Sequence, residues 1–138
     1  KGKAKITKAY QDLSAAIDST GLCIFFAVRN LAGKTLEVPP VGILAYLNAA
    51  TGADYTLEEL MQASERIITA ERQFLVRAGM SRKDDALPPR LTRDPMPSGP
   101  AEGMVCHLEE MLDEYYREQG WTDEGIPTRE RLASLGLA

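Results

Sequence analysis

Cysteine, histidine and long apolar runs are all scarce in this sequence. Its 138 residues include two cysteines and one histidine. Cys23 and Cys106 lie far apart in a chain without secretory features, so we judge each as a thiol or a metal ligand and expect no disulfide framework. No apolar run approaches the roughly 20 residues of a transmembrane helix, and the start has no signal-peptide pattern. We therefore expect a cytoplasmic protein that does not enter a membrane.

Positive charge is not in excess either. The chain has 16 lysines and arginines against 20 acidic residues, which gives a formal net charge of -4. Binding of nucleic acid needs clustered basic side chains that neutralise phosphates. Lys1, Lys3, Lys5 and Lys8 alternate with small or apolar residues, and we interpret them as the solvated face of a helix. Nucleic acid is therefore not the expected partner.

The overall composition is that of a folded globular chain. Hydrophobic residues make up 44% and charged residues 26% of the sequence, and the length suits one domain with its own core. The first residue is not Met and lies in a helical pattern, so we expect a segment of a longer chain. No repeat and no alternation of period two is visible. The sequence predicts an all-α fold, an irregular helical bundle that forms one domain over residues 1–138.

Apolar spacing predicts the individual helices. Steps of three and four residues predict a helix over residues 4–17, and Thr56 followed by Glu59 has the spacing of a capping box at the start of the longest helix. That helix is expected to end near Gly79, which can supply a left-handed stop. Further helices are predicted from Pro39 and Pro40 to Gly52, over residues 104–119, and in a short segment that ends near Leu135. The apolar run at residues 22–28 is expected to be buried.

A proline-rich stretch separates the longest helix from the next one. Residues 80–103 contain five of the eight prolines and have no apolar period, which predicts an extended loop. Loops of this length inside a compact domain are usually functional or lie on a partner surface. We expect charged residues between Arg82 and Arg90 to anchor the loop.

The segment from Asp18 to Cys23 has residue types that suit a cofactor. The Asp18 carboxylate offers two acceptor oxygens for paired donors of a planar heterocycle, and Gly21 allows a flat ligand to approach the backbone. A thiolate such as that of Cys23 is the usual ligand of iron-sulfur clusters, although one cysteine cannot hold a cluster. In the alternative interpretation, Asp18 only ends a helix and Cys23 is a small buried hydrophobe.

Several further segments, taken in order along the chain, give a more specific indication. They are Asp18-x-x-Gly21-Leu22-Cys23, Asn48 to Gly52, Glu58-Glu59-Leu60, Glu65-Arg66, Arg77 with Gly79, Arg82 to Arg90, Tyr115-Tyr116, Gly120-Trp121, Gly125 to Thr128 and Leu135-Gly136-Leu137. In this order they resemble the C-terminal helical part of the aldehyde ferredoxin oxidoreductase family. The resemblance runs from about Asp18 to the end of the chain.

The resemblance implies a function for the turn after residue 17. It makes Asp18, Gly21 and Leu22 contacts of one pterin in a bis-pterin tungsten or molybdenum cofactor (tungstopterin), and Cys23 the last ligand of a 4Fe-4S cluster. The enzyme would oxidise aldehydes to carboxylic acids with ferredoxin as acceptor. Its N-terminal domains, with the other cluster cysteines, would be partners of this chain. The chain on its own is then expected to be inactive and to hold no cofactor.

A stand-alone helical interaction module without catalysis is the alternative function. In that case the proline-rich loop and the apolar faces would bind a protein partner. Other conspicuous residues have simpler interpretations. His107 is expected at the surface, Glu65 and Arg66 are expected to form a structural ion pair, and Trp121 is expected to be a core or docking anchor.

Overall fold

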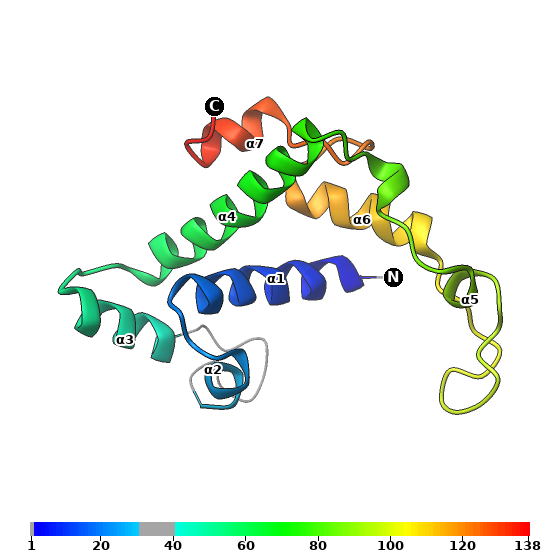
Figure 1. Cartoon of the computed structure of the whole chain (residues 1–138), viewed down its shortest axis with the longest axis horizontal. Coiled ribbons are helices and arrows are strands. Elements are labelled where there is room, and N and C mark those ends of the chain that lie inside the picture. Colours follow the sequence, from blue (N-terminus) through cyan, green and yellow to red (C-terminus); the bar gives the residue numbers. More distant parts are fainter. Residues whose placement is uncertain (1, 31–40) are drawn as a thin grey trace.

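The computed structural model describes residues 2–30 and 41–138, with only the backbone for residues 28–30. This part of the chain contains helices joined by turns and loops, and no strand (Figure 1). One isolated bridge pairs Trp121 with Pro127. No helix within the described ranges is long and apolar enough to cross a membrane. The all-α prediction is confirmed.

Three long helices form the frame of the molecule. They are α1 (Lys3–Ser19), α4 (Leu57–Arg77) and α6 (Leu108–Gln119). α1 packs against both α4 and α6 (Figure 1). The short helix α7 (Arg129–Ser134) lies beside α4 near the C-terminus. α1 is therefore the central element on which the other two long helices are placed.

The apolar core lies at the C-terminal end of α1. Ala16 and Ile17 of α1 pack there with Ala27 of α2 (Ile24–Asn30), Ile43 of α3 (Val41–Thr51) and Leu60 of α4. Ile17, Ala27 and Ile43 are completely buried. This cluster fixes the end of α1 relative to three other helices.

The longest helix begins as the sequence predicts. The Thr56 hydroxyl accepts a hydrogen bond from the backbone N–H of Glu59, and the Glu59 carboxylate accepts one from the N–H of Thr56 at 2.7 Å. The reciprocal pair satisfies two N–H groups that the helix itself cannot use. Pro39 and Pro40, which were predicted to open the preceding helix, lie outside the described residues.

The predicted helix over residues 104–119 begins four residues later, at Leu108. The backbone N–H of Met104 donates to Ala101, and that of Cys106 donates to Leu91 at 2.8 Å. These bonds tie residues 104–106 to the proline-rich segment instead of to α6. We call residues 86–106, which include the one-turn helix α5 (Pro89–Thr92), the arm.

The apolar run at residues 22–28 was predicted to be buried, but several of its large side chains are exposed. Phe25 is 85% exposed, Phe26 50% and Ile24 40%, whereas Ala27 is completely buried. A short helix laid on the end of α1 can bury only one side. An apolar run without periodicity therefore places some large side chains in the interface and others in solvent.

Lys8 does not lie on a solvated face, as the sequence interpretation assumed. Lys3 and Lys5 are exposed, but the ammonium of Lys8 lies 2.6 Å from the Asp12 carboxylate and 2.5 Å from that of Glu65. Burial raises the pKa of Asp12, and the pairing with Lys8 opposes that shift. α1 therefore contacts α4 partly through buried charges.

The predicted ion pair between Glu65 and Arg66 does not form. The second oxygen of Glu65 contacts the guanidinium of Arg131 on α7 at 2.9 Å. Arg66 donates from Nε to the carbonyl of Leu135 at 2.7 Å. Because neighbours on a helix point in different directions, Glu65 and Arg66 reach different elements.

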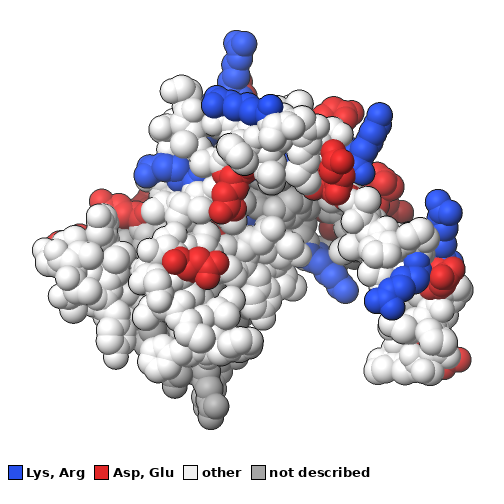
Figure 2. Space-filling view, viewed as in Figure 1, with Lys and Arg blue, Asp and Glu red and all other residues white. Residues whose placement is uncertain are grey.

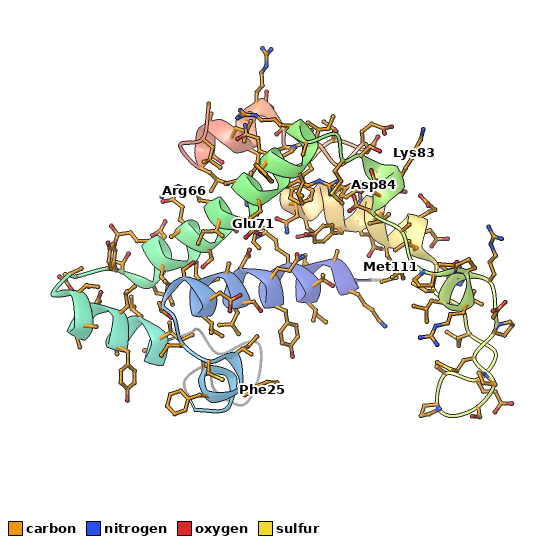
Figure 3. All side chains as sticks on the ribbon, viewed as in Figure 1. Phe25, Arg66, Glu71, Lys83, Asp84 and Met111 are labelled. Atoms are coloured by element: carbon orange, nitrogen blue, oxygen red, sulfur yellow. The ribbon has the colours of Figure 1, made fainter. Side chains whose placement is uncertain are left out.

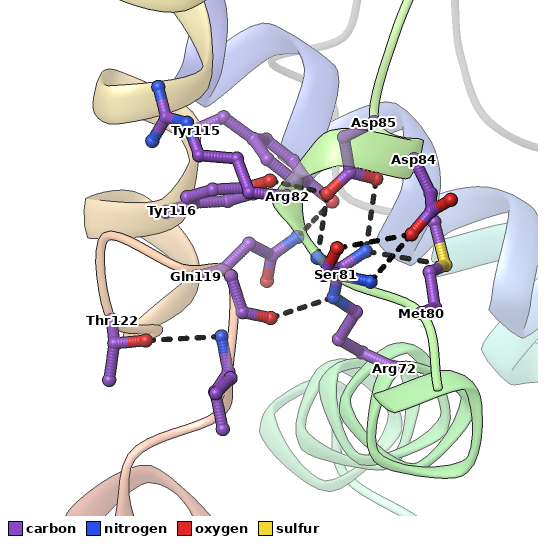
Figure 4. A network of polar contacts seen from close by, with 12 residues as sticks. Arg72, Met80, Ser81, Arg82, Asp84, Asp85, Tyr115, Tyr116, Gln119 and Thr122 are labelled. Carbon is purple, nitrogen blue, oxygen red and sulfur yellow. Dashed lines mark hydrogen bonds and ion pairs between the residues drawn. The ribbon is translucent and has the colours of Figure 1, made fainter. Parts of the chain in front are cut away.

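The guanidinium of Arg72 connects α4 to three other segments (Figure 4). Its Nη1 and Nη2 donate to the two carboxylate oxygens of Asp85 at 3.0 and 2.6 Å, and its Nε donates to the carbonyl of Gly125 at 2.7 Å. The charged carbon lies 5.7 Å from the ring centre of Tyr116 and 5.1 Å from that of Trp121. Only 5% of Arg72 is exposed, so these partners replace the water that would otherwise solvate its charge.

Asp85 is held in its ionised form by this arrangement. Burial alone would raise the pKa of Asp85, but the hydrogen bonds from Arg72 and Tyr116 outweigh burial and lower it. The Tyr116 hydroxyl donates to the same carboxylate. Burial and this hydrogen bond raise the pKa of Tyr116 to about 12. The tyrosine thus remains a neutral donor to Asp85 at neutral pH.

Arg82 anchors the arm at its base, as predicted for the run that begins with this residue. It lies in a short 3-10 helix, η1 (Arg82–Asp84). Its guanidinium contacts Glu109 at 2.9 Å and Asp113 at 2.7 Å, both on α6, and donates to the carbonyl of Asp123 at 2.8 Å. The N-terminal end of the arm is therefore fixed to α6 and to the loop that follows it.

The first testable prediction concerns the Asp85 carboxylate. Its pKa in the folded chain is lower than the ordinary value of 3.8, so the stability that it contributes is present above that pH and is lost as the pH falls through 3.8 and below. Asp85→Asn should lower the midpoint of urea unfolding at pH 7 and make the midpoint less dependent on pH between about 5 and 3. Equal acid dependence in both proteins would contradict this.

A second prediction compares two glycines with similar backbone angles. Gly125 and Gly136 have φ of 74° and 66°. A Cβ at Gly125 would lie 2.3 Å from Nη2 of Arg72, whereas a Cβ at Gly136 would have no heavy atom within 4 Å apart from its neighbours in the chain. Gly136→Ala should cost about 1 kcal/mol of unfolding free energy from backbone strain. Gly125→Ala should cost at least about 2 kcal/mol more, because it displaces a buried guanidinium. Urea unfolding measures both, and equal losses would contradict the close packing.

Candidate functional site

The turn after α1 gathers the residues that the sequence singles out. The backbone N–H of Thr20 donates to Ala16 and Ile17, and that of Gly21 donates to the carbonyl of Asp18 at 3.1 Å. Gly21 has φ of 72°, a left-handed conformation that residues with a Cβ adopt only with strain. The chain therefore reverses within a few residues and then enters α2.

Asp18, Gly21 and Cys23 are all exposed on this turn, and Leu22 is half-buried against the apolar core. The structure thus places the four predicted residues in one exposed turn, and Leu22 packs this turn against the apolar core. The alternative interpretation of Cys23 as a buried hydrophobe is wrong for this structure, because the side chain lies in solvent.

α2 carries exposed aromatic side chains directly after Cys23. The carbonyl of Cys23 accepts the N–H of Ala27 at 2.9 Å, so the cysteine begins the first turn of α2. Phe25 projects from this helix (Figure 3). The exposed thiol of Cys23 therefore lies next to apolar side chains that are also exposed to solvent in this chain.

The donor set suits part of a metal site and not a whole one. The turn offers one thiol and one carboxylate. No group of three or more His, Cys, Asp or Glu side chains that could hold a metal lies within residues 2–30 and 41–138. Cys106 belongs to the arm, at the other end of the molecule in Figure 1, where its sulfur lies 3.7 Å from that of Met111. An iron-sulfur cluster at Cys23 would need its other thiolates from outside the described residues.

A hollow of about 470 Å³ adjoins the turn between α1, α3 and α4. Ser19 and Thr20 of the turn line it together with Tyr55 and Arg66. Sequence reasoning did not predict this neighbourhood, because no motif connects these positions. The spacing of α1, α3 and α4 creates the hollow, and that spacing follows from tertiary packing.

The other polar groups of interest have structural surroundings. Arg72 with Asp85, and Lys8 with Glu65, lie between helices and neutralise one another. His107 is exposed, as predicted, and precedes α6 without a side-chain cap. Trp121 is buried and lies edge-on to Tyr115, which makes it a core residue. The exposed turn remains the candidate site.

Comparison with known proteins connects this chain to a family of oxidoreductases. Residues 1–137 match the family model described as aldehyde ferredoxin oxidoreductase, domains 2 and 3. A tungsten-containing aldehyde ferredoxin oxidoreductase of Pyrococcus furiosus is 42% identical over 99% of this chain and 21% of its own length. The corresponding protein of Thermococcus kodakarensis gives the same values.

Two further similarities extend the comparison. The aliphatic sulfonate oxidoreductase WOR-like subunit of Pyrococcus furiosus is 36% identical over 69% of this chain. Among solved structures, the active-site complex BamBC of benzoyl coenzyme A reductase, with a bound 1,5-dienoyl-CoA, matches 97% of this chain and 19% of its own with a TM-score of 0.68 and 30% identity. The chain thus spans about a fifth of the length of the curated tungsten enzymes that it matches.

The exposure of the two cysteines gives a third prediction. Cys23 is exposed and Cys106 is partly covered, and thiol reactivity depends on access as well as on thiolate content. A disulfide reagent should modify Cys23 first in this chain. The fast phase should vanish in Cys23→Ala and persist in Cys106→Ala, as followed by mass spectrometry. If the fast phase followed Cys106, the exposed turn would be wrong.

Proposed function

The chain belongs to the aldehyde ferredoxin oxidoreductase family, and we propose that its turn from Asp18 to Cys23 helps to seat the tungstopterin and a 4Fe-4S cluster of a longer enzyme. That enzyme would oxidise aldehydes to carboxylic acids in the cytoplasm, with ferredoxin as acceptor. Molybdenum in place of tungsten is compatible with the same turn. The chain would form one domain that works with the N-terminal domains of the same enzyme.

The exposure of the turn is the observation that supports this proposal most. A free cysteine with only a structural role is usually buried. Cys23 is instead in solvent, and the exposed Asp18 carboxylate accepts no hydrogen bond from the described part of the chain. Both side chains are therefore available to groups outside this chain.

Each residue of the turn has a separate role. The Cys23 sulfur, as a thiolate, would be one of the four protein ligands of the cluster. The Asp18 carboxylate would accept paired N–H groups of a pterin, which a neutral amide could do at only one oxygen. Gly21 keeps the backbone open to a flat ring system, and Leu22 attaches the turn to the core. When bound, the metal cofactor supplies the redox chemistry that these side chains cannot perform.

The surroundings of the turn suit burial against another domain. Phe25, two residues after Cys23, is largely exposed in this chain, and Phe26 is half exposed. On the face shown in Figure 2, the surface over α2 and α3 carries few charged side chains. Apolar surface of this kind typically marks a contact with another protein surface. Such a contact would also exclude water from the cluster, and solvent access affects cluster potentials.

The fourth prediction tests the two assigned ligands in the full-length enzyme. Cys23→Ala should remove one thiolate, so the iron content should fall and electron exit should fail while the helical fold is kept. Asp18→Asn keeps the shape of the side chain but replaces an acceptor with a donor, so the tungsten and pterin content should fall first. Iron, tungsten and aldehyde oxidation are measured for both variants.

Cys106→Ala is the matched control, because it removes the other cysteine at a site far from the turn. It should keep the iron content and activity of the parent enzyme. Full cluster content and activity in Cys23→Ala would remove the ligand assignment. A loss of iron in Cys106→Ala equal to that in Cys23→Ala would show that the effect is not specific to the turn.

A further inference from the structure

The arm extends away from the helices while its base is firmly held. Figure 1 shows α5 and the loop beyond it projecting from the body beside the start of α6. At the base, Asp85 is bound by Arg72, and Arg82 bridges to Glu109 and Asp113. Cys106 donates its N–H to Leu91, which joins the two branches of the arm. The direction of the arm is therefore fixed by the body.

The tip of the arm has its own hydrogen bonds. The N–H of Met96 donates to Met104 at 3.0 Å, and the N–H of Gly103 donates back to Met96 at 2.9 Å. Gly99 and Gly103 have φ of 90° and 76°, which lets the chain fold back in a narrow loop. Prolines at five positions of the arm further restrict its unfolded conformations. The tip is therefore preorganised without support from the helices.

The apolar side chains of the arm are only partly covered by the described part of the chain. Met104 is 63% exposed, Met96 46%, Leu87 39% and Leu91 38%. All residues from 93 to 104 are exposed, and the stretch 95–101 has no charged residue. A preorganised tip whose residues 95–101 are uncharged and exposed is suited to insertion against another surface.

The base of the arm also leaves a hollow. A space of about 510 Å³ opens between the start of α1 and α6, and Met104, Val105, Met111 and Lys3 are among its lining residues. We call this hollow the notch. Apolar side chains therefore line both the arm and the notch beside it. A partner that contacts Met104 can also fill this notch.

We propose that the arm is a docking element that lies against the remaining part of the same enzyme chain, with Met96, Met104 and the adjoining notch as its contact surface. The proposal rests on the proposed function only in that this chain works within a longer enzyme. Rigid elements of this kind lose little conformational freedom on binding, which favours a permanent contact.

The length of the relatives indicates what covers the arm. Curated members of the family continue for about four times the length matched here, because the chain spans 21% of them. The solved benzoyl coenzyme A reductase chain matches 97% of this chain, and the small remainder is shorter than the arm. Most of the arm therefore belongs to the shared structure, and each relative has a large further part of its own chain that can cover the arm.

The fifth prediction uses the methionines as natural probes. In the full-length enzyme, peroxide should oxidise Met96 and Met104 about ten-fold more slowly than in a peptide of residues 93–106, because oxidation of methionine depends on exposure. Mass spectrometry resolves each site. Met61 and Met80, which are half-buried and do not line the notch, serve as internal references. Equal rates for Met96 and Met104 in the enzyme and the peptide would overturn the proposal.

A photoreactive amino acid in place of Met104 identifies the surface that covers the arm. Cross-links to the same chain outside the segment of residues 1–138 support the proposal, whereas cross-links only to a second copy or to another protein overturn it. The same protection of Met96 should persist in the Cys23→Ala enzyme, because the contact does not involve the cluster. Protection of Met96 together with a complete cluster in the Cys23→Ala enzyme would refute the ligand assignment alone. An unprotected Met96 in a parent enzyme that loses its cluster on Cys23→Ala would refute the docking alone.

Discussion

The bidentate pair between Arg72 and Asp85 is the interaction on which most of this structure depends. It joins α4 to the base of the arm, and the same guanidinium holds the carbonyl of Gly125. Through Tyr116, which donates to Asp85, the pair also fixes α6. Replacing such a pair by apolar groups can leave stability unchanged, but removing one partner leaves a buried charge. Its role is therefore to select one arrangement of four segments, and α1 rests on two of them.

The position of α1 in turn determines what the chain presents to its surroundings. Its central part carries buried charges from Lys8 and Asp12 toward α4, and its end is fixed by Ile17 in the apolar core. The helix therefore stops at a defined place, and Gly21 turns the backbone so that Cys23 faces solvent. The exposed turn and the projecting arm lie at opposite ends of the molecule (Figure 1). Both ends expose apolar side chains, as expected of a chain that works within a larger enzyme.

Local signals in the sequence predicted the helices, but they could not predict contacts between residues that lie far apart in the chain. The capping box at Thr56 and the turn at Gly21 depend on residues a few positions apart, which the sequence displays directly. Asp85 lies 13 residues from Arg72 and 31 from Tyr116, and no pattern announces such a pairing. The burial of Lys8 and the exposure of Phe25 were mispredicted for the same reason, since each depends on where another helix packs. The family resemblance added a hypothesis for the role of Cys23, which periodicity cannot provide.

The central claim is that Cys23 binds iron in the complete enzyme. Anomalous X-ray diffraction at the iron absorption edge, from crystals of the full-length protein, tests it without relying on activity. The account predicts a four-iron cluster with the Cys23 sulfur bonded to one iron, beside a tungsten- or molybdenum-bound pterin within hydrogen-bonding reach of the Asp18 carboxylate. A cluster held by four other ligands, with Cys23 away from every iron, would contradict it.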